Sequence, residues 1–220
     1  MKRGILYISI GALLALSGCG DNPLNAGPGG TLSTFSFEKD MEGWKANGTD
    51  LEMGGKVVDW SVARSQDMAR GGSASVKLYV DNRTDAAKIW MEKPLAVKPN
   101  RTYLVTVEYD FASADYGSFN LFQIITGVLP KPPLAGGLPE PPLAQGDGKD
   151  ASTLDPSVFQ GDTGNGQDAD VGYRWMSKKY EFTARSGMDG TLHVLVGVWG
   201  TWESPRTYYL DNLRMTLAEK

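Results

Sequence analysis

The sequence of 220 residues contains one cysteine and one histidine, and this scarcity limits the chemistry that the chain can perform. No disulfide can form within the chain, and zinc sites built from cysteine and histidine are excluded. Catalysis by a Cys–His pair is disfavoured for the same reason. Long helical runs rich in alanine, leucine, glutamate and lysine are also missing, whereas glycine (27) and proline (12) are plentiful. This composition favours an all-β fold.

Positive charge is the second scarcity. Twenty-two lysines and arginines face 26 aspartates and glutamates, so the formal net charge is −4. Recognition of a phosphate backbone needs a basic surface, and nucleic acid is therefore not expected as a partner. Hydrophobic residues make up 41% of the chain and charged residues 22%, which is the balance of a folded domain rather than a disordered one.

The first residues have the pattern of a bacterial secretory signal. Lys2 and Arg3 precede the uncharged stretch 4–16, which is shorter than the roughly 20 residues of a membrane-spanning helix. The sequence Leu-Ser-Gly-Cys at 16–19 then resembles a lipobox. We predict a signal peptide over 1–18 and a lipidated Cys19 that anchors the protein in the cell envelope, with Gly20 favouring the outer membrane. The alternative is an ordinary secretory signal with an incidental cysteine.

The rest of the chain divides into a tether and one domain. Residues 19–33 are rich in glycine, proline and asparagine and are predicted to be a flexible tether. From residue 34 onward, short runs alternate between apolar and polar residues, which is typical of half-buried antiparallel strands. We therefore predict an all-β antiparallel β-sandwich over 34–220, with about nine strands. The expected strands are Thr34–Glu38, Lys56–Ala63, Ser73–Val80, Lys88–Lys93, Thr102–Ala112, Ser118–Thr126, Lys178–Ala184, Thr191–Trp199 and Thr207–Leu217.

One long segment interrupts this spacing. Residues 129–137 (LPKPPLAGG) and 138–146 (LPEPPLAQG) form a tandem repeat, and an acidic, glycine-rich stretch follows them. Proline at this density favours an extended conformation and excludes a central strand. We predict a mobile insertion over 128–172 at the rim of the sandwich.

Five motifs occur along the chain in an informative order: FSFEKDMEGW (35–44), GGSASVKL (71–78), VKPNRTYLVTVEY (97–109), RWMSKKYEFTA (174–184) and YYLDNLRM (208–215). Together they resemble the galactose-binding-like β-sandwich of carbohydrate-binding modules, a jelly roll, especially families four, nine and twenty-two. The resemblance covers residues 34–218 apart from the insertion. It implies a non-catalytic protein whose partner is a poly- or oligosaccharide.

The resemblance also implies a structural calcium ion that joins the first strand to the last. Glu38 and Asp211 match the acidic positions of the family, and backbone carbonyls near Gly72 and Ser73 would complete a cage of oxygen ligands. Asn212 replaces a second aspartate that is common in the family, which would weaken the site. The alternative is that Glu38 is solvated and Asp211 closes a turn.

Sugar binding in such modules depends on aromatic side chains that stack on sugar rings, with amides and carboxylates beside them. Alternation turns His193 and Trp199 away from the aliphatic residues of strand 191–199, and turns Trp90 away from Ile89 and Met91. For any single tryptophan the alternative is a place in the core. We predict one ligand face made of Trp90, Trp199, Trp202, Glu108, Asp110, Gln123 and His193.

Two other functions stay open. Glu108 and Asp110 are two residues apart on a strand, about 7 Å, which lies between the carboxylate separations of retaining and inverting glycosidases. A glycan hydrolase or lyase is therefore possible, although an exposed polar strand face gives the same pattern far more often. The stronger alternative is an envelope scaffold lipoprotein that binds another envelope protein, through the proline-rich repeat. The leading interpretation is a non-enzymatic, lipid-anchored carbohydrate-binding protein.

Overall fold

The computed structural model describes residues 30–114, 122–133, 173–200 and 205–220. In these ranges the chain forms strands β1 to β12, and none of the ranges contains a helix long and apolar enough to cross a membrane. The strands are β1 (Thr31–Phe35), β2 (Lys45–Thr49), β3 (Glu52–Met53), β4 (Lys56–Val57), β5 (Asp59–Ser65), β6 (Ser75–Asp81), β7 (Lys88–Ala96), β8 (Thr102–Ala114), β9 (Phe122–Leu129), β10 (Tyr173–Arg185), β11 (Thr191–Gly200) and β12 (Pro205–Glu219).

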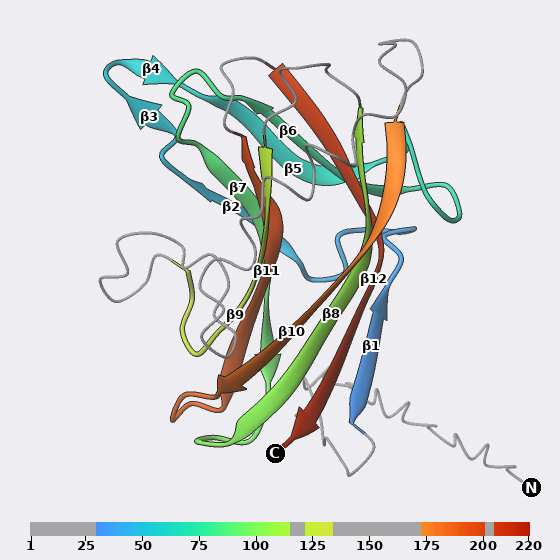
Figure 1. Ribbon diagram of the computed structural model, residues 1–220, viewed down its shortest axis with the longest axis vertical. Coiled ribbons are helices and arrows are strands. Elements are labelled where there is room, and N and C mark those ends of the chain that lie inside the picture. Colours follow the sequence, from blue (N-terminus) through green and yellow to red (C-terminus); the bar gives the residue numbers. More distant parts are fainter. Residues whose placement is uncertain (1–29, 115–121, 134–172, 201–204) are drawn as a thin grey trace, which may run out of the picture.

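The strands form two main sheets (Figure 1). Sheet A has the order β10-β8-β12-β6-β5, with β1 added beside β12, and sheet B has the order β2-β7-β11-β9. β3 and β4 form a small separate hairpin. All pairings are antiparallel, so the predicted all-β antiparallel β-sandwich is confirmed.

The core lies between the inner faces of the two sheets, where alternate residues of each strand meet. Val105, Val107 and Phe111 of β8 pack there against residues of β11 such as Val194 and Val196. The hydroxyl groups of Tyr109 in sheet A and Thr126 in sheet B are 2.6 Å apart in this interior. Burial raises the pKa of Tyr109 well above its usual value, which keeps the phenol protonated as a neutral hydrogen-bonding group.

β12 is the longest strand and links several parts of sheet A. Its first half pairs with β6, from Pro205 to Leu210, and its second half pairs with β1, from Leu213 to Leu217. Thr31–Ser33 therefore belong to the sheet, so the predicted tether, which extended to residue 33, is too long. The sequence did not reveal this boundary because β1 is held by backbone pairing, while its second residue, Leu32, is exposed.

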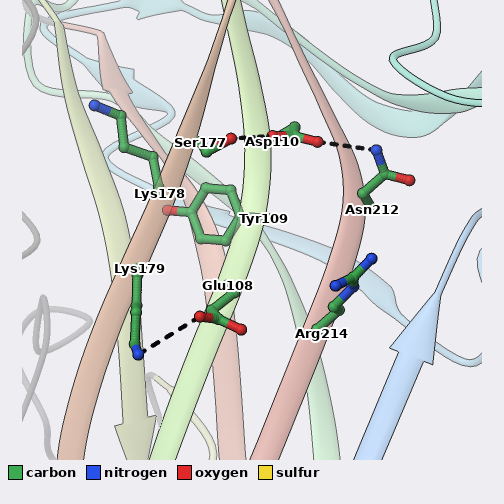
Figure 2. Close-up of a pocket in the computed structure, with 8 residues that line it drawn as sticks. All are labelled: Glu108, Tyr109, Asp110, Ser177, Lys178, Lys179, Asn212 and Arg214. Atoms are coloured by element: carbon green, nitrogen blue, oxygen red, sulfur yellow. Dashed lines mark hydrogen bonds and ion pairs between the residues drawn. The ribbon is translucent and has the colours of Figure 1, made fainter.

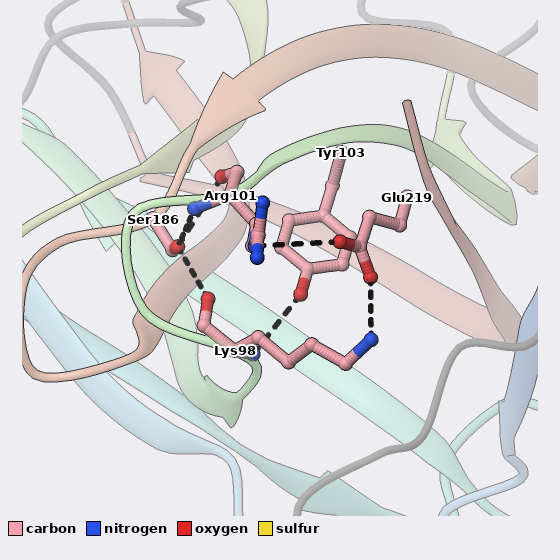
Figure 3. Close-up of polar contacts among 5 residues, drawn as sticks. All are labelled: Lys98, Arg101, Tyr103, Ser186 and Glu219. Carbon is pink, nitrogen blue, oxygen red and sulfur yellow. Dashed lines mark hydrogen bonds and ion pairs between the residues drawn. The ribbon is translucent and has the colours of Figure 1, made fainter.

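A polar cluster closes one end of the sandwich (Figure 3). Ser186, which is buried, donates its hydroxyl to the carbonyl of Lys98 (2.7 Å) and accepts the backbone N–H of Arg101 (3.1 Å). The hydroxyl of Tyr103 accepts the backbone N–H of Lys98, whose ammonium lies 2.8 Å from Glu219. The pKa of the Glu219 carboxyl is lowered mainly by Lys98. These contacts join the β7–β8 and β10–β11 connections to the end of β12, and thus tie sheet A to sheet B.

Candidate ligand-binding pocket

A polar pocket of about 310 Å³ lies on the outer face of sheet A, over β10, β8 and β12 (Figure 2). It is lined by Glu108, Tyr109, Asp110, Ser177, Lys178, Lys179, Asn212 and Arg214. Glu108 and Asp110 point outward because Val107, Tyr109 and Phe111, which alternate with them on β8, face the core. The predicted pairing of these two carboxylates on one strand face is therefore confirmed.

Two rows of side chains cross the three strands in this pocket. In the first row the backbone pairing sets Lys179, Glu108 and Arg214 side by side, and the Lys179 ammonium lies 3.6 Å from the Glu108 carboxylate. In the second row Asp110 accepts the hydroxyl of Ser177 at 2.6 Å. The first row sets a carboxylate between two cations, and the second sets a carboxylate between a hydroxyl and an amide, so the pocket offers both hydrogen-bond donors and acceptors.

A β-bulge in β12 brings Asn212 into the pocket. The register between β12 and β8 shifts between Asp211 and Arg214, and Asn212 takes a left-handed backbone conformation with φ 52°. This conformation is one that asparagine tolerates better than most residues. Its side-chain amide then donates to Asp110 at 2.9 Å. Asp110 is thus held on both oxygens, by Ser177 from one neighbouring strand and by Asn212 from the other.

Trp90 and Trp199 lie on the opposite side of the molecule, on the outer face of sheet B. Trp90 does point away from Ile89 and Met91, as alternation predicted, but it is 0% exposed and clusters with Ile125, Leu129 and Leu195. The expectation of an exposed Trp90 is wrong, because apolar residues of β9 and β11 surround it. The expectation of one ligand face is also wrong, since Glu108 and Asp110 lie on sheet A.

Trp199 and His193 also lie on this outer face of sheet B. Trp199 is half-buried against the same cluster, and the ammonium of Lys88 lies 4.7 Å from the centre of its ring. One ring face of Trp199 is therefore already engaged by a cation. His193 is half-buried, and burial lowers its pKa while Glu92 and Asp189 act in the opposite direction. The Trp90 indole donates to Glu92 at 2.7 Å.

Three predicted residues are described only in part or not at all. The backbone of Gln123 in β9 pairs with Trp199, but its side chain lies outside the described residues. Trp202 and Cys19 lie outside them entirely. Most of the predicted insertion, from residue 134 to 172, is outside them as well, while β9 continues through its first two positions to Leu129. Their proposed roles stay predictions.

The residues predicted to bind calcium converge on one loop. Glu38 accepts the backbone N–H of Ser73 on both oxygens (3.0 and 3.1 Å), the Ser73 hydroxyl (2.8 Å) and the N–H of Ala74 (3.3 Å). Asp211 accepts the N–H groups of Arg70 (2.8 Å) and Gly71 (3.0 Å). The two carboxylates thus hold opposite ends of the loop 70–74.

In this arrangement the residues do not fit a calcium ion. A carboxylate has about four lone-pair positions, and Glu38 uses one for each of the four contacts that it makes with Ser73 and Ala74. The predicted calcium site would form only if Glu38 released part of the loop.

No protein-family model matches the sequence, and no curated protein matches it either. Similar solved structures include the N-terminal CBM22-1–CBM22-2 tandem domain of Xyn10C from Paenibacillus barcinonensis, with 16% identity and a TM-score of 0.45 over 89% of this chain and 47% of that one. The chain therefore spans about half the length of that tandem. The CBM22-1 xylan-binding domain of the same protein gives 18% identity and a TM-score of 0.43, over 89% of this chain and 99% of that one.

The K1 cleaved adhesin domain of Lys-gingipain from Porphyromonas gingivalis W83 is similar at the same level. It shows 10% identity and a TM-score of 0.44, over 84% of this chain and 98% of that domain. At these identities and TM-scores neither a family nor a ligand passes from these structures to the chain. The class of ligand has to be inferred from the residues that line the pocket.

Proposed function

We propose that the protein binds a carbohydrate non-catalytically, and that the polar pocket of sheet A is the binding site. The observation that carries the proposal is the convergence of carboxylate, amide, hydroxyl, ammonium and guanidinium groups from β8, β10 and β12 in one concavity. A sugar hydroxyl both donates and accepts, so a pocket with alternating donors and acceptors suits a hydroxyl-rich ligand. The motif resemblance to carbohydrate-binding modules points to the same class.

The rigidity of the pocket supports this proposal. Asp110 is fixed by Ser177 and Asn212, and the groups that line the pocket stand on paired strands rather than on loops. Groups held in place before the ligand arrives lose little entropy on binding. The volume of about 310 Å³ is at the lower end of ligand pockets, which span roughly 300–1,000 Å³, and suits a short saccharide segment.

The proposal includes a location in the cell envelope. The lipobox-like sequence that ends in Cys19 supports acylation at that thiol and an anchor in the outer membrane. Cys19→Ser should then abolish lipid incorporation and leave uncleaved precursor or soluble protein. Unchanged incorporation of labelled palmitate into the Cys19→Ser chain would contradict the anchor without affecting the glycan proposal.

A glycan array followed by binding isotherms tests the site. We expect Asp110→Ala and Arg214→Ala each to weaken binding about tenfold or more, because each removes a charged hydrogen-bonding group worth about 1.5–3 kcal/mol. Arg185→Ala is the matched control, since Arg185 is an exposed arginine at the far end of β10. Arg214→Ala and Arg185→Ala should melt close to wild type. Asp110→Ala also loses the hydrogen bonds from Ser177 and Asn212, so its binding is measured at a temperature at which its melting curve shows it folded.

The same experiment separates the alternatives. Equal glycan binding by the wild type and both pocket variants would reject the pocket as the site. Absence of any glycan binding, together with specific capture of one envelope protein, would favour the scaffold function. Turnover of a polysaccharide that disappears in Glu108→Gln or Asp110→Asn would show a hydrolase or lyase instead.

A further inference from the structure

We infer that the guanidinium of Arg64 holds the segment after β1 in place of a metal ion, so that the folded protein needs no calcium. Arg64 lies near the end of β5 and reaches the chain that follows β1. Its Nε donates to the carbonyl of Phe37 at 2.9 Å, and its Nη2 donates to the carbonyl of Glu38 at 2.7 Å. This inference does not depend on the proposed function.

The local backbone is shaped for this contact. Phe37 has a left-handed φ of 57°, an uncommon conformation for an aromatic residue. Its side chain is fully buried in the core, so the turn is fixed in position. The carbonyls of Phe37 and Glu38 meet one planar guanidinium, whose donors form a rigid fork suited to two neighbouring acceptors. A calcium ion would compete for oxygens of this same segment.

The other side of the site is closed by hydrogen bonds. The carboxylate of Glu38 points to the loop 70–74 and accepts hydrogen bonds from Ser73 and Ala74. The backbone carbonyl of Glu38 accepts a hydrogen bond from Arg64. Gly72 in the same loop has φ 68°, and a Cβ there would collide with the Glu38 carboxylate. The backbone at Gly72 therefore lies so close to the Glu38 carboxylate that only glycine fits there. We call this set of Phe37, Glu38, Arg64 and loop 70–74 the arginine clasp.

The charge balance of the arginine clasp agrees with this role. The guanidinium of Arg64 donates to the carbonyl of Glu38 at 2.7 Å, which places a positive charge next to this part of the chain. A permanent cation therefore already occupies the backbone carbonyls of this segment. Because guanidinium stays protonated at all physiological pH values, the contact does not depend on the supply of an ion.

Thermal unfolding and calorimetry on the whole protein test the inference. We expect the wild-type melting temperature to be the same in EDTA and in millimolar calcium chloride, and titration of calcium into the wild type to give no binding heat. Arg64→Ala should lower the melting temperature by about 4 °C or more, because two charge-assisted hydrogen bonds to the backbone are lost. Arg83→Ala is the control, since Arg83 pairs with Asp81 but its side chain is 61% exposed, and it should melt close to wild type.

Arg64→Lys adds a variant that keeps the charge but not the fork. It should melt between wild type and Arg64→Ala, because one ammonium replaces the planar pair of donors. A fall in the wild-type melting temperature on chelation, or calcium binding by the wild type, would overturn the inference. Equal melting temperatures of Arg64→Ala and the Arg83→Ala control would also overturn it. If Arg64→Ala fails to fold, the chelation and calorimetry of the wild type and the Arg64→Lys melt still decide.

Discussion

Replacing Trp90 distinguishes a core residue from a ligand platform. The side chain is fully buried on the outer face of sheet B, among Ile125, Leu129 and Leu195. Gly197 lies opposite it on β11, where an added Cβ would collide with Trp90 and with the backbone of Ile89. β7 and β11 are therefore already in close contact at this point. They cannot move closer together to fill the cavity that removal of the indole leaves.

The size of the effect follows from these contacts. Removal of a buried tryptophan side chain costs about 3–5 kcal/mol in the free energy of unfolding, and a site that cannot collapse lies in the upper part of that range. In a chain of this size that corresponds to a fall in melting temperature of roughly 6–20 °C. Trp90→Phe keeps part of the packing but removes the hydrogen bond from the indole to Glu92. It should therefore cost about 1–3 kcal/mol.

Urea unfolding followed by circular dichroism measures both variants, and glycan isotherms are recorded on the same samples. Trp175→Ala is a suitable control, because Trp175 is a half-buried tryptophan on β10 and its loss should cost less. An unfolding midpoint for Trp90→Ala equal to that of the wild type, combined with lost glycan binding, would refute the reasoning. Trp90 would then be a ligand platform, and sheet B rather than sheet A would carry the site.

Three further outcomes are expected. Ser186→Ala should lower the free energy of unfolding by about 1–3 kcal/mol, because buried backbone groups lose their partner, and an unchanged urea midpoint would count against the polar cluster of Figure 3. Gly72→Ala should destabilise more than Gly54→Ala in the same assay; both glycines have a left-handed φ, but a Cβ at Gly54 meets nothing within 4 Å. Hydrogen bonds lower the folded-state pKa of Glu38, so its contribution to stability is present above about pH 4.5 and is lost as the pH falls further. Between pH 6 and 3, the melting temperature of Glu38→Gln should therefore fall less steeply than that of the wild type.

The strands that the sequence predicted well are those with one clearly buried face. β6, β8 and β11 begin and end within about two residues of the expected ranges, because their apolar residues alternate without interruption. β2 was not predicted, since its sequence KANGT has no apolar alternation and the strand lies at an edge of sheet B. Such a strand is specified by its pairing with β7, which local sequence does not reveal.

The sequence predicted the positions of site residues only where alternation along a single strand determines them. Alternation along β8 placed Glu108 and Asp110 together. The partners Ser177, Lys179 and Asn212 depend on the registers of β10 and β12 with β8 and on the bulge of β12, all of which are long-range properties. Alternation also gave the side of the sheet to which Trp90 points, but not whether other side chains surround it there.

The pairing of β1 with β12 has a mechanical consequence. If the chain is anchored at Cys19, a pull on it enters the domain at Gly30 and passes into β1, whose Thr31 pairs with Leu217 near the end of β12. The load runs along the antiparallel pair, so five residue pairs resist together in shear rather than opening one after another. It reaches β12, the strand that carries Asn212 and Arg214, without crossing between the two sheets. A ligand held in the pocket and the membrane anchor would therefore be connected through one sheet.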